Sequence, residues 1–556
     1  MSILSTVFLR LTALKNALPL SPLTLTALTL VFIFIVDNST FWSIAIAIFS
    51  GHLVSLAVYI LAVFCLMLAA FSLFAFPWTV KPFLAFMLIL SSITSYYMDN
   101  LGVVIDRDMI QNVMVTTFTE SKHLITLSFV LRVLIAGVLP ALVVFAVKLK
   151  PQGKAKAALL PVVSFVLSLA LAAGLLMTDM KSYASILRER KDFMSAFQPG
   201  MPLVSTIRYA KMMSRSANTT MASIGTDAKK GPAYAQGDKP VLTIVVAGET
   251  ARTQNFSLNG YGVDTNPNLE KLPVISFSQV SSCGTATAVS LPCMFSKFDR
   301  GDYSYEKGVS TENVLDVMKH AGFKVEWWDN NTGDKGLAAR IPSRSFTNTD
   351  NQQFCPTGEC DDGIFMQALK DYAASITEDT VLVMHQIGSH GPTYYLRYPP
   401  EFERFTPACR TAEFKNCTPQ EIVNVYDNSI AYTDAILAQT IEFLQSQDQL
   451  TTSLLYVSDH GESLGEGGLY LHGSPYFMAP DVQTKVPMIL WMSNAFSDKF
   501  NIDRSCIASK KTDTLSHDNL FHSLLGMLDI DTSERNASLD IFASCKGSKK
   551  VVQIDR

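Results

Sequence analysis

Charged residues are scarce in this chain: Asp, Glu, Lys and Arg make up 17% of its 556 residues and leave a net charge of −4 at pH 7. The sequence has no basic patch interleaved with aromatic residues, no internal repeat and no low-complexity tract. The missing basic patch argues against a nucleic-acid partner. Hydrophobic residues, at 48% with a positive mean hydropathy, are too abundant for a wholly soluble protein.

The apolar residues concentrate in the first third of the chain. Five stretches there are each about long enough to cross a bilayer, and they run near 21–40, 44–76, 79–98, 123–147 and 157–178. The first lies too far from a small-residue cleavage site to be a removable signal peptide. The remainder has the composition of a soluble domain large enough for its own core.

Lysine and arginine are missing from the loop after the first stretch, which carries Asp37. Basic residues gather at the alternate loops, namely at Arg10, Lys15, Lys81, Lys148, Lys150, Lys154 and Lys156. Because cytoplasmic loops carry an excess of Lys and Arg, these loops are expected inside the cell. Five crossings from an inside N-terminus then deliver residue 180 onward to the outer side.

Cysteine is almost missing from the apolar third, where Cys65 is the single example. The other eight lie beyond it, mostly in close pairs and never with CxxC spacing: Cys283, Cys293, Cys355, Cys360, Cys409, Cys417, Cys506 and Cys545. An even, paired set indicates disulfides and hence an oxidising compartment. Free or metal-binding thiols are the alternative, which the spacing disfavours. Cysteines and basic residues therefore both predict a soluble domain outside the cytoplasm.

From Val241 onward, β-rich runs alternate with helical patterns, which indicates an α/β domain with a mainly parallel sheet. Three predicted strands end in acids or imidazoles: VLTIVVAGETAR at Glu249, TVLVMHQIGSHGP at His385 and His390, and TSLLYVSDHGES at Asp459, His460 and Glu462. Ligand sites form beyond the carboxyl ends of such strands, so we expect the three ends to converge. Carboxylates with imidazoles suit zinc or a similar divalent ion.

A lone Asp-His pair after a strand is more often a structural hydrogen-bonded pair. Three such strand ends in one domain, with His472 shortly after the third, favour a metal site. The remaining histidines lack this context and are expected to be structural or surface residues: His52, His123, His320, His517 and His522.

The segment SSCGTATAVSLPCMFS is the candidate nucleophile segment. Gly284 precedes Thr285, and the small residues that follow can open a helix. A hydroxyl at a helix N-terminus faces backbone N–H groups, which suits a phosphoryl group, and metal coordination would activate it. Cys283 and Cys293 bracket the segment, so a disulfide would fix its geometry. The alternative is a Ser/Thr-rich helix cap with an incidental bridge.

Residues 181–238 are polar and mixed. Leu203, Ile207, Ala210 and Met213 have helical apolar spacing. This helix fits the membrane surface and a position packed on the soluble domain equally well. The stretch SANTTMASIGTDAKKGPAYAQGDKP that follows is predicted to be a linker.

Several motifs together resemble one known family. They are VVAGETAR, SSCGTATAVSLPCMFS, the DNN…DKG segment at 329–336, IGSHGPTYY, NVYDN and YVSDHGESLGEGGLYLHG. In this order they resemble the lipid A phosphoethanolamine transferases, including the mobile colistin-resistance enzymes, within the alkaline phosphatase/sulfatase-like superfamily. The likeness implies a transmembrane domain at 1–180 with five helices, a linker and membrane-surface helix at 181–238, and an alkaline phosphatase-like catalytic domain at 239–556.

The resemblance also implies roles for individual residues. It implies a zinc ion held by Glu249, Thr285, Asp459 and His460, with His390 and His472 serving the substrate phosphate or a second metal. Asn331 and Lys335 match positions that help to bind the transferred group, although many relatives carry a further cysteine pair where this chain has Asp334 and Ala338. Family pairing implies the disulfides Cys283–Cys293, Cys355–Cys360, Cys409–Cys417 and Cys506–Cys545.

The loop between the third and fourth spans is expected to grip the donor lipid. Asn112, Thr116 and Glu120 are four residues apart, so on one helix they share a face with an amide, a hydroxyl and a carboxylate. The alternative is a solvated interfacial helix with ordinary polar residues. The resemblance favours donor binding, because matching positions in the family contact the donor.

The implied activity is transfer of phosphoethanolamine from phosphatidylethanolamine to a lipid A phosphate through a covalent phosphoethanolamine-threonine. That reaction lowers surface negative charge and gives polymyxin resistance. The expected protein is a monomer of the bacterial inner membrane, surrounded by membrane lipids, with its catalytic domain in the periplasm.

Other activities compete with this interpretation. They are phosphoethanolamine or phosphoglycerol transfer to another envelope glycan, and an envelope phosphodiesterase. Thr285 cannot form the aldehyde that a sulfatase needs. A metal sensor or transporter fits less well, because the spans hold few ionisable groups, of which Arg132 is the clearest.

Overall fold

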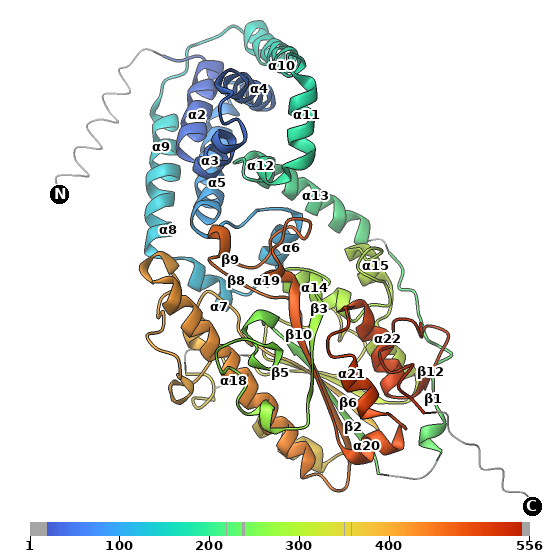
Figure 1. Ribbon diagram of the computed structural model, residues 1–556. Helices are drawn as coiled ribbons and strands as arrows, with labels where there is room; N and C mark the ends of the chain where they lie inside the picture. Colours follow the sequence, from blue (N-terminus) through green and yellow to red (C-terminus); the bar gives the residue numbers. More distant parts are fainter. Residues whose placement is uncertain are drawn as a thin grey trace, which may run out of the picture. The chain divides into compact units, whose positions relative to one another are not determined.

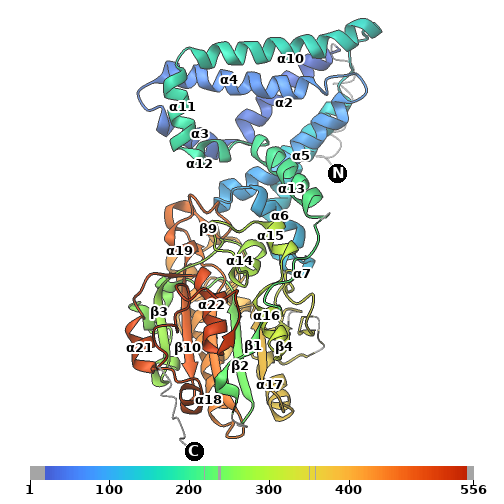
Figure 2. The same cartoon turned by 90° about the vertical axis from the view of Figure 1, so that its right-hand side faces the viewer.

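The computed structural model describes residues 19–547 except 218, 236–238, 348, 350 and 357, with backbone alone at 119–120. Within this part the chain divides into two compact units, labelled by element in Figures 1 and 2. The helical unit contains the described residues up to Arg107 and Ile125–Arg208. The catalytic unit contains Asp108–Leu124 and the described residues from Tyr209 onward.

Long apolar helices dominate the helical unit. Four are long and apolar enough to cross a membrane: α4 (Leu53–Ser72), α5 (Val80–Leu101), the continuous run Leu127–Ala146 and α10 (Lys154–Met177). The run Leu127–Ala146 consists of α8 (Leu127–Arg132), a π-helical turn (Val133–Val138) and α9 (Leu139–Ala146). A fifth span is completed if α2 (Pro22–Val36) and α3 (Ser39–Ile48), bent by 74° to each other, count as one.

The predicted bounds of the first two spans are wrong. The chain bends at Asp37 and Asn38, inside the predicted stretch 21–40, and α3 and α4 divide the stretch 44–76. Both polar side chains are buried and find partners outside the helix. Asp37 lies 3.1 Å from the guanidinium of Arg132, and the Asn38 amide exchanges hydrogen bonds with the backbone of Gln198. An apolar count cannot detect such a bend, because it treats both residues as two isolated polar positions.

Three shorter helices follow the spans: α11 (Met180–Glu189), α12 (Lys191–Ser195) and α13 (Gly200–Ser216). The stretch predicted as a linker is built into the catalytic unit over much of its described length. Strand β1 (Lys229–Lys230) pairs with β12 (Ile530–Asp531), and Asp227 accepts hydrogen bonds from Thr532 and Ser533. Its composition of small and polar residues therefore reflects turns and an edge strand rather than a free linker.

An eight-stranded sheet forms the centre of the catalytic unit, in the order β11-β3-β10-β7-β2-β6-β4-β5. The strands are β2 (Val241–Gly248), β3 (Ile275–Ser281), β4 (Lys324–Asp329), β5 (Ser343–Ser345), β6 (Thr380–His385), β7 (Thr451–Ser458), β10 (Lys485–Met492) and β11 (Leu515–Ser516). Strand β10 is antiparallel to both neighbours, and the other described pairings are parallel. The mainly parallel α/β fold is thus confirmed.

Helices cover the two faces of the sheet (Figures 1 and 2). They are α14 (Thr287–Met294), α15 (Tyr305–Ser310), α16 (Val314–His320), α17 (Ile364–Ala374), α18 (Pro419–Gln445), α19 (Asp481–Thr484), α20 (Asn494–Lys499), α21 (Arg504–Ser509) and α22 (Asp518–Met527). A continuous apolar core joins side chains of β2, β7 and β10 to α14, α16 and α22. Strands β8 (Ser463–Leu464) and β9 (Tyr470–Leu471) form a small hairpin, and α6 (Arg107–Val115) and α7 (Phe118–Ser121) complete the inventory.

Candidate active site

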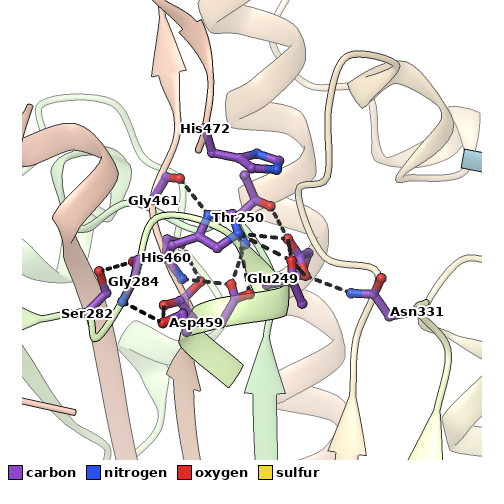
Figure 3. Close-up of polar contacts among 12 residues, drawn as sticks. Glu249, Thr250, Ser282, Gly284, Asn331, Asp459, His460, Gly461 and His472 are labelled. Carbon is purple, nitrogen blue, oxygen red and sulfur yellow. Dashed lines mark hydrogen bonds and ion pairs between the residues drawn. The ribbon is translucent and has the colours of Figure 1, made fainter. Parts of the chain in front are cut away.

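Three side chains converge at the carboxyl ends of two adjacent central strands. Glu249 follows β2, whereas Asp459 and His460 follow β7, and parallel pairing sets Gly248 opposite Ser458. Each residue offers one ligand atom within 4.8 Å of the others (Figure 3). All three are at most 1% exposed. These residues form the metal-type group that the sequence predicts.

The chemistry of these side chains fits a divalent cation. His460 Nδ1 lies 2.9 Å from the Gly461 carbonyl, so it carries the proton and Nε2 faces the two carboxylates. Asp459 Oδ1 accepts from the backbone N–H groups of Thr250 and His460, whereas Oδ2 is buried without a hydrogen-bond partner. A buried carboxylate oxygen without a donor is costly unless a cation neutralises it.

The two carboxylates perturb each other's ionisation. Burial and the Glu249 charge raise the pKa of Asp459. Burial also opposes ionisation of Glu249, but positive charge on His460, His390 and His472 outweighs it and lowers its pKa. One carboxylate is therefore held ionised at the expense of the other, a conflict that a bound divalent cation would relieve.

Several contacts fix the Glu249 carboxylate in the site. Asn331 Nδ2 donates to Glu249 Oε2 at 2.8 Å, and Thr250 Oγ1 donates to Oε1 at 2.5 Å. Gly388, with φ +50°, packs against the backbone of Glu249, where an added Cβ would lie 2.6 Å from the carbonyl oxygen. Asn331 therefore orients Glu249 through this bond, and its binding of the transferred group remains a prediction.

Thr285, predicted as metal ligand and nucleophile, makes its side-chain hydrogen bond outside this group of three residues. Its hydroxyl donates to the Ser474 carbonyl at 2.6 Å. The hydroxyl of Thr287, two residues later, lies 3.1 and 3.2 Å from the Glu249 carboxylate oxygens and 3.4 Å from His460 Nε2. Helix α14 begins at Thr287, so the helix-start argument applies to that residue.

A disulfide between Cys283 and Cys293 ties the start of the nucleophile segment to helix α14. The segment is also held from the sheet side, because Ser290 Oγ donates to the Asp459 carbonyl and Ser282 N donates to the Thr484 carbonyl. The other cysteines pair as Cys355–Cys360, Cys409–Cys417 and Cys506–Cys545, and Cys65 is free.

Two further histidines line the same site. The rings of His390 and His472 lie 5.4 Å apart, and that of His472 lies 4.4 Å from the His460 ring. Glu462 Oε2 lies 2.8 Å from His472 Nδ1 and fixes the ring beside the metal-type group. Burial raises the pKa of Glu462 to about 8, even though Tyr394 donates a hydrogen bond to its other oxygen. This pair can hold and move a proton next to a reacting oxygen.

Lys335 stands in a left-handed turn with φ 50°. Its ammonium donates to the carbonyl and hydroxyl oxygens of Thr332 at 2.7 Å each. Asp334 closes the same turn by accepting from the N–H groups of Gly336 and Ala338. Hydrogen bonds from backbone N–H groups to an aspartate carboxylate thus secure this turn.

Asn112 and Thr116 do not share one continuous helix with Glu120. Helix α6 ends at Val115 and α7 begins at Phe118. The Thr116 hydroxyl donates to the Asn112 carbonyl at 2.7 Å, a side-chain bond that competes with the helical ladder. Both described side chains are half-buried. The side chain of Glu120 lies outside the described residues, and donor binding by these residues remains a prediction.

Another site residue missed from the sequence is His517. The imidazole is 2% exposed, accepts from Cys283 N at 3.0 Å and donates to the Ser458 carbonyl at 2.9 Å. Burial lowers its pKa to about 4, so the ring is neutral. It links the nucleophile segment to the strand that carries Asp459. No local pattern marks it, because its partners are distant in sequence.

Comparison with known proteins gives two matching family profiles. The one described as "Phosphoethanolamine transferase EptA/EptB" matches residues 63–213, and the one described as "Sulfatase" matches 242–530. Phosphoethanolamine transferase EptA of Salmonella typhimurium is 41% identical over 479 residues, which cover 85% of this chain and 87% of that protein. Phosphatidylethanolamine transferase Mcr-1 of Escherichia coli is 36% identical over 527 residues, which cover 92% of this chain and 95% of that protein.

A solved structure of similar extent also matches. The integral membrane protein lipooligosaccharide phosphoethanolamine transferase A of Neisseria meningitidis superposes with a TM-score of 0.91 at 35% identity. The match covers 94% of this chain and 99% of that one.

Proposed function

Since the chain belongs to the phosphoethanolamine transferase family, with a catalytic domain of the sulfatase type, we propose that it transfers phosphoethanolamine from phosphatidylethanolamine to a phosphate of lipid A. It acts at the bacterial inner membrane, with the catalytic unit in the periplasm. The added ammonium groups lower the negative charge of the cell surface and so weaken polymyxin binding.

One observation carries the proposed mechanism. The Thr287 hydroxyl lies at a helix start, within 3.4 Å of both Glu249 and His460. Thr287 is therefore the nucleophile. Glu249, Asp459 and His460 would hold a zinc ion, which would lower the pKa of the threonine hydroxyl and neutralise phosphate charge.

The reaction has two displacements at one phosphorus. In the first, Thr287 Oγ forms a bond to phosphorus, the bond to the glycerol oxygen breaks, and diacylglycerol leaves. In the second, a lipid A phosphate oxygen attacks, and the bond to Thr287 breaks. In the first step His472, oriented by Glu462, and His390 pass the threonine proton to the departing glycerol oxygen. In the second step they pass a proton from the attacking phosphate group to Thr287.

Hydrolysis of the same covalent intermediate would make the protein a phosphodiesterase. Anchoring among membrane lipids favours transfer, because donor and acceptor are both lipids. Mass spectrometry of lipid A from cells that express the wild type or Thr287→Ala tests the proposal. Phosphoethanolamine on lipid A in the wild type alone is expected. Release of free phosphoethanolamine with unmodified lipid A would replace transfer by hydrolysis.

A further inference from the structure

Helix α14 contains a proline at a position that leaves a carbonyl without its helical donor. In an α-helix the N–H of residue i+4 donates to the carbonyl of residue i. For Ala288 that residue is Pro292, which has no N–H. Ala288 is 3% exposed, so water does not readily satisfy the carbonyl. This residue directly follows Thr287.

A side chain from a distant part of the sequence donates the missing hydrogen bond to the Ala288 carbonyl. Gln111 Nε2, on helix α6, donates to the Ala288 carbonyl at 3.1 Å. The Gln111 side chain is 5% exposed, whereas its neighbour Val113 on the same helix is 61% exposed. The Gln111 amide is therefore buried against helix α14, which carries Thr287.

Gln111 belongs to the segment Asp108–Leu124 of the catalytic unit. Two further residues of this segment make contacts close to His472 and His390. Met109 packs so closely on Gly473, the residue after His472, that a Cβ there would lie 2.4 Å from the methionine methyl group. His123 lies 3.3 Å from Glu359, which pairs with Arg397 at 3.0 Å; Arg397 in turn donates to the His390 carbonyl. The segment thus contacts the residues that follow Thr287 and His472 and connects to His390 through Glu359 and Arg397.

We propose that Gln111 is a positioning residue for the transfer reaction, because it supplies to the nucleophile helix the hydrogen bond that Pro292 removes. The segment Asp108–Leu124 thereby fixes the position of the first turn of α14 and the direction of the Thr287 hydroxyl. This inference rests on the proposed function only for the role of Thr287; the docking of Gln111 on α14 stands on its own contacts.

A double-mutant cycle in the full-length protein tests the proposal. Gln111→Met keeps the length of the side chain but has no N–H, and it should lower kcat for transfer from phosphatidylethanolamine by roughly ten- to a hundredfold, with little change in KM. Pro292→Ala restores a backbone N–H that can bond to Ala288. In that background, Gln111→Met should cost less than about threefold. Equal losses in both backgrounds, or no loss in either, would overturn the assignment.

Hydrogen–deuterium exchange of the peptide 284–294 is a second readout that needs no activity. Gln111→Met should speed exchange there, whereas Val113→Ala, an exposed position on the same helix, should not. Unchanged exchange in Gln111→Met overturns the inference even if the variant folds poorly elsewhere. A wild type that transfers nothing, yet shows the expected exchange difference, refutes the proposed function and leaves the docking of Gln111 supported.

Discussion

The strand ends and the nucleophile segment build the same site in different ways. Glu249 and Asp459 leave adjacent parallel strands, and the hydrogen-bond register of the sheet determines where they lie. The nucleophile segment from Cys283 to Cys293 is instead closed by its own disulfide and held by hydrogen bonds with His517 and Gln111. The metal-type group therefore depends on the core of the sheet, whereas the nucleophile depends on contacts from distant segments.

The largest expected effect separates the two threonines of that segment. Thr287→Ala should reduce transfer by several orders of magnitude, as loss of a nucleophile does. Thr285→Ala loses only the bond to Ser474, so its activity should fall far less. Peptide mass analysis after incubation with phosphatidylethanolamine should find the phosphoethanolamine adduct on Thr287. An adduct on Thr285 would reverse the assignment.

Metal removal tests the strand-end half of the site. Exhaustive chelation should abolish turnover, and zinc should restore it, because Asp459 and Glu249 otherwise leave buried charge unneutralised. Asp459→Asn should lower the bound zinc measured by elemental analysis, whereas Thr287→Ala should retain the ligands Glu249, Asp459 and His460 and hence most of the metal. Full activity in metal-free protein would contradict the proposed role of the three ligands.

His517 connects the two halves, and its two bonds can be removed separately. His517→Asn keeps an acceptor near the position of Nδ1 for Cys283, whereas His517→Gln keeps a donor near Nε2 for Ser458. If the bond to the nucleophile segment matters more, the Gln variant should lose about tenfold in kcat and the Asn variant less. Steady-state kinetics of the two variants measures these losses in kcat. The zinc content of each variant serves as the control for an intact metal site. Larger loss in the Asn variant would give the strand contact priority.

The smallest effect concerns acid stability of the contacts around Glu359. Burial raises the pKa of this carboxyl, but the His123 imidazole 3.3 Å away and the charge of Arg397 outweigh burial and lower the pKa to about 2. Because the folded pKa lies below the unfolded value, the contribution is complete above about pH 4.5 and is lost as pH falls toward 2. The melting temperature of Glu359→Gln should lie below that of the wild type at pH 7.

This difference in melting temperature should shrink as the pH falls from about 4.5 toward 2. A contribution on the order of 1–3 kcal/mol corresponds to a few degrees. A constant difference across this range would mean that the ionised form of Glu359 does not stabilise the fold.

The parallel sheet and the three metal-type residues could be predicted, because apolar runs that end in Glu249 or Asp459 carry the information locally. The sequence could not show which threonine lies beside Glu249 and His460, because Thr285 and Thr287 differ only in where α14 starts. The bend at Asp37 and Asn38 depends on partners far along the chain. So does the bond of Gln111 to Ala288, for which the only local sign is Pro292.

The strand order has a consequence for biosynthesis. Strand β2 is made early, but its neighbour β7 emerges two hundred residues later, so Glu249 leaves the ribosome long before Asp459 and His460. The chain consequently cannot assemble its three-residue metal group during most of its export. A metal ion can therefore meet all three residues together only after Asp459 and His460 have followed Glu249 across the membrane.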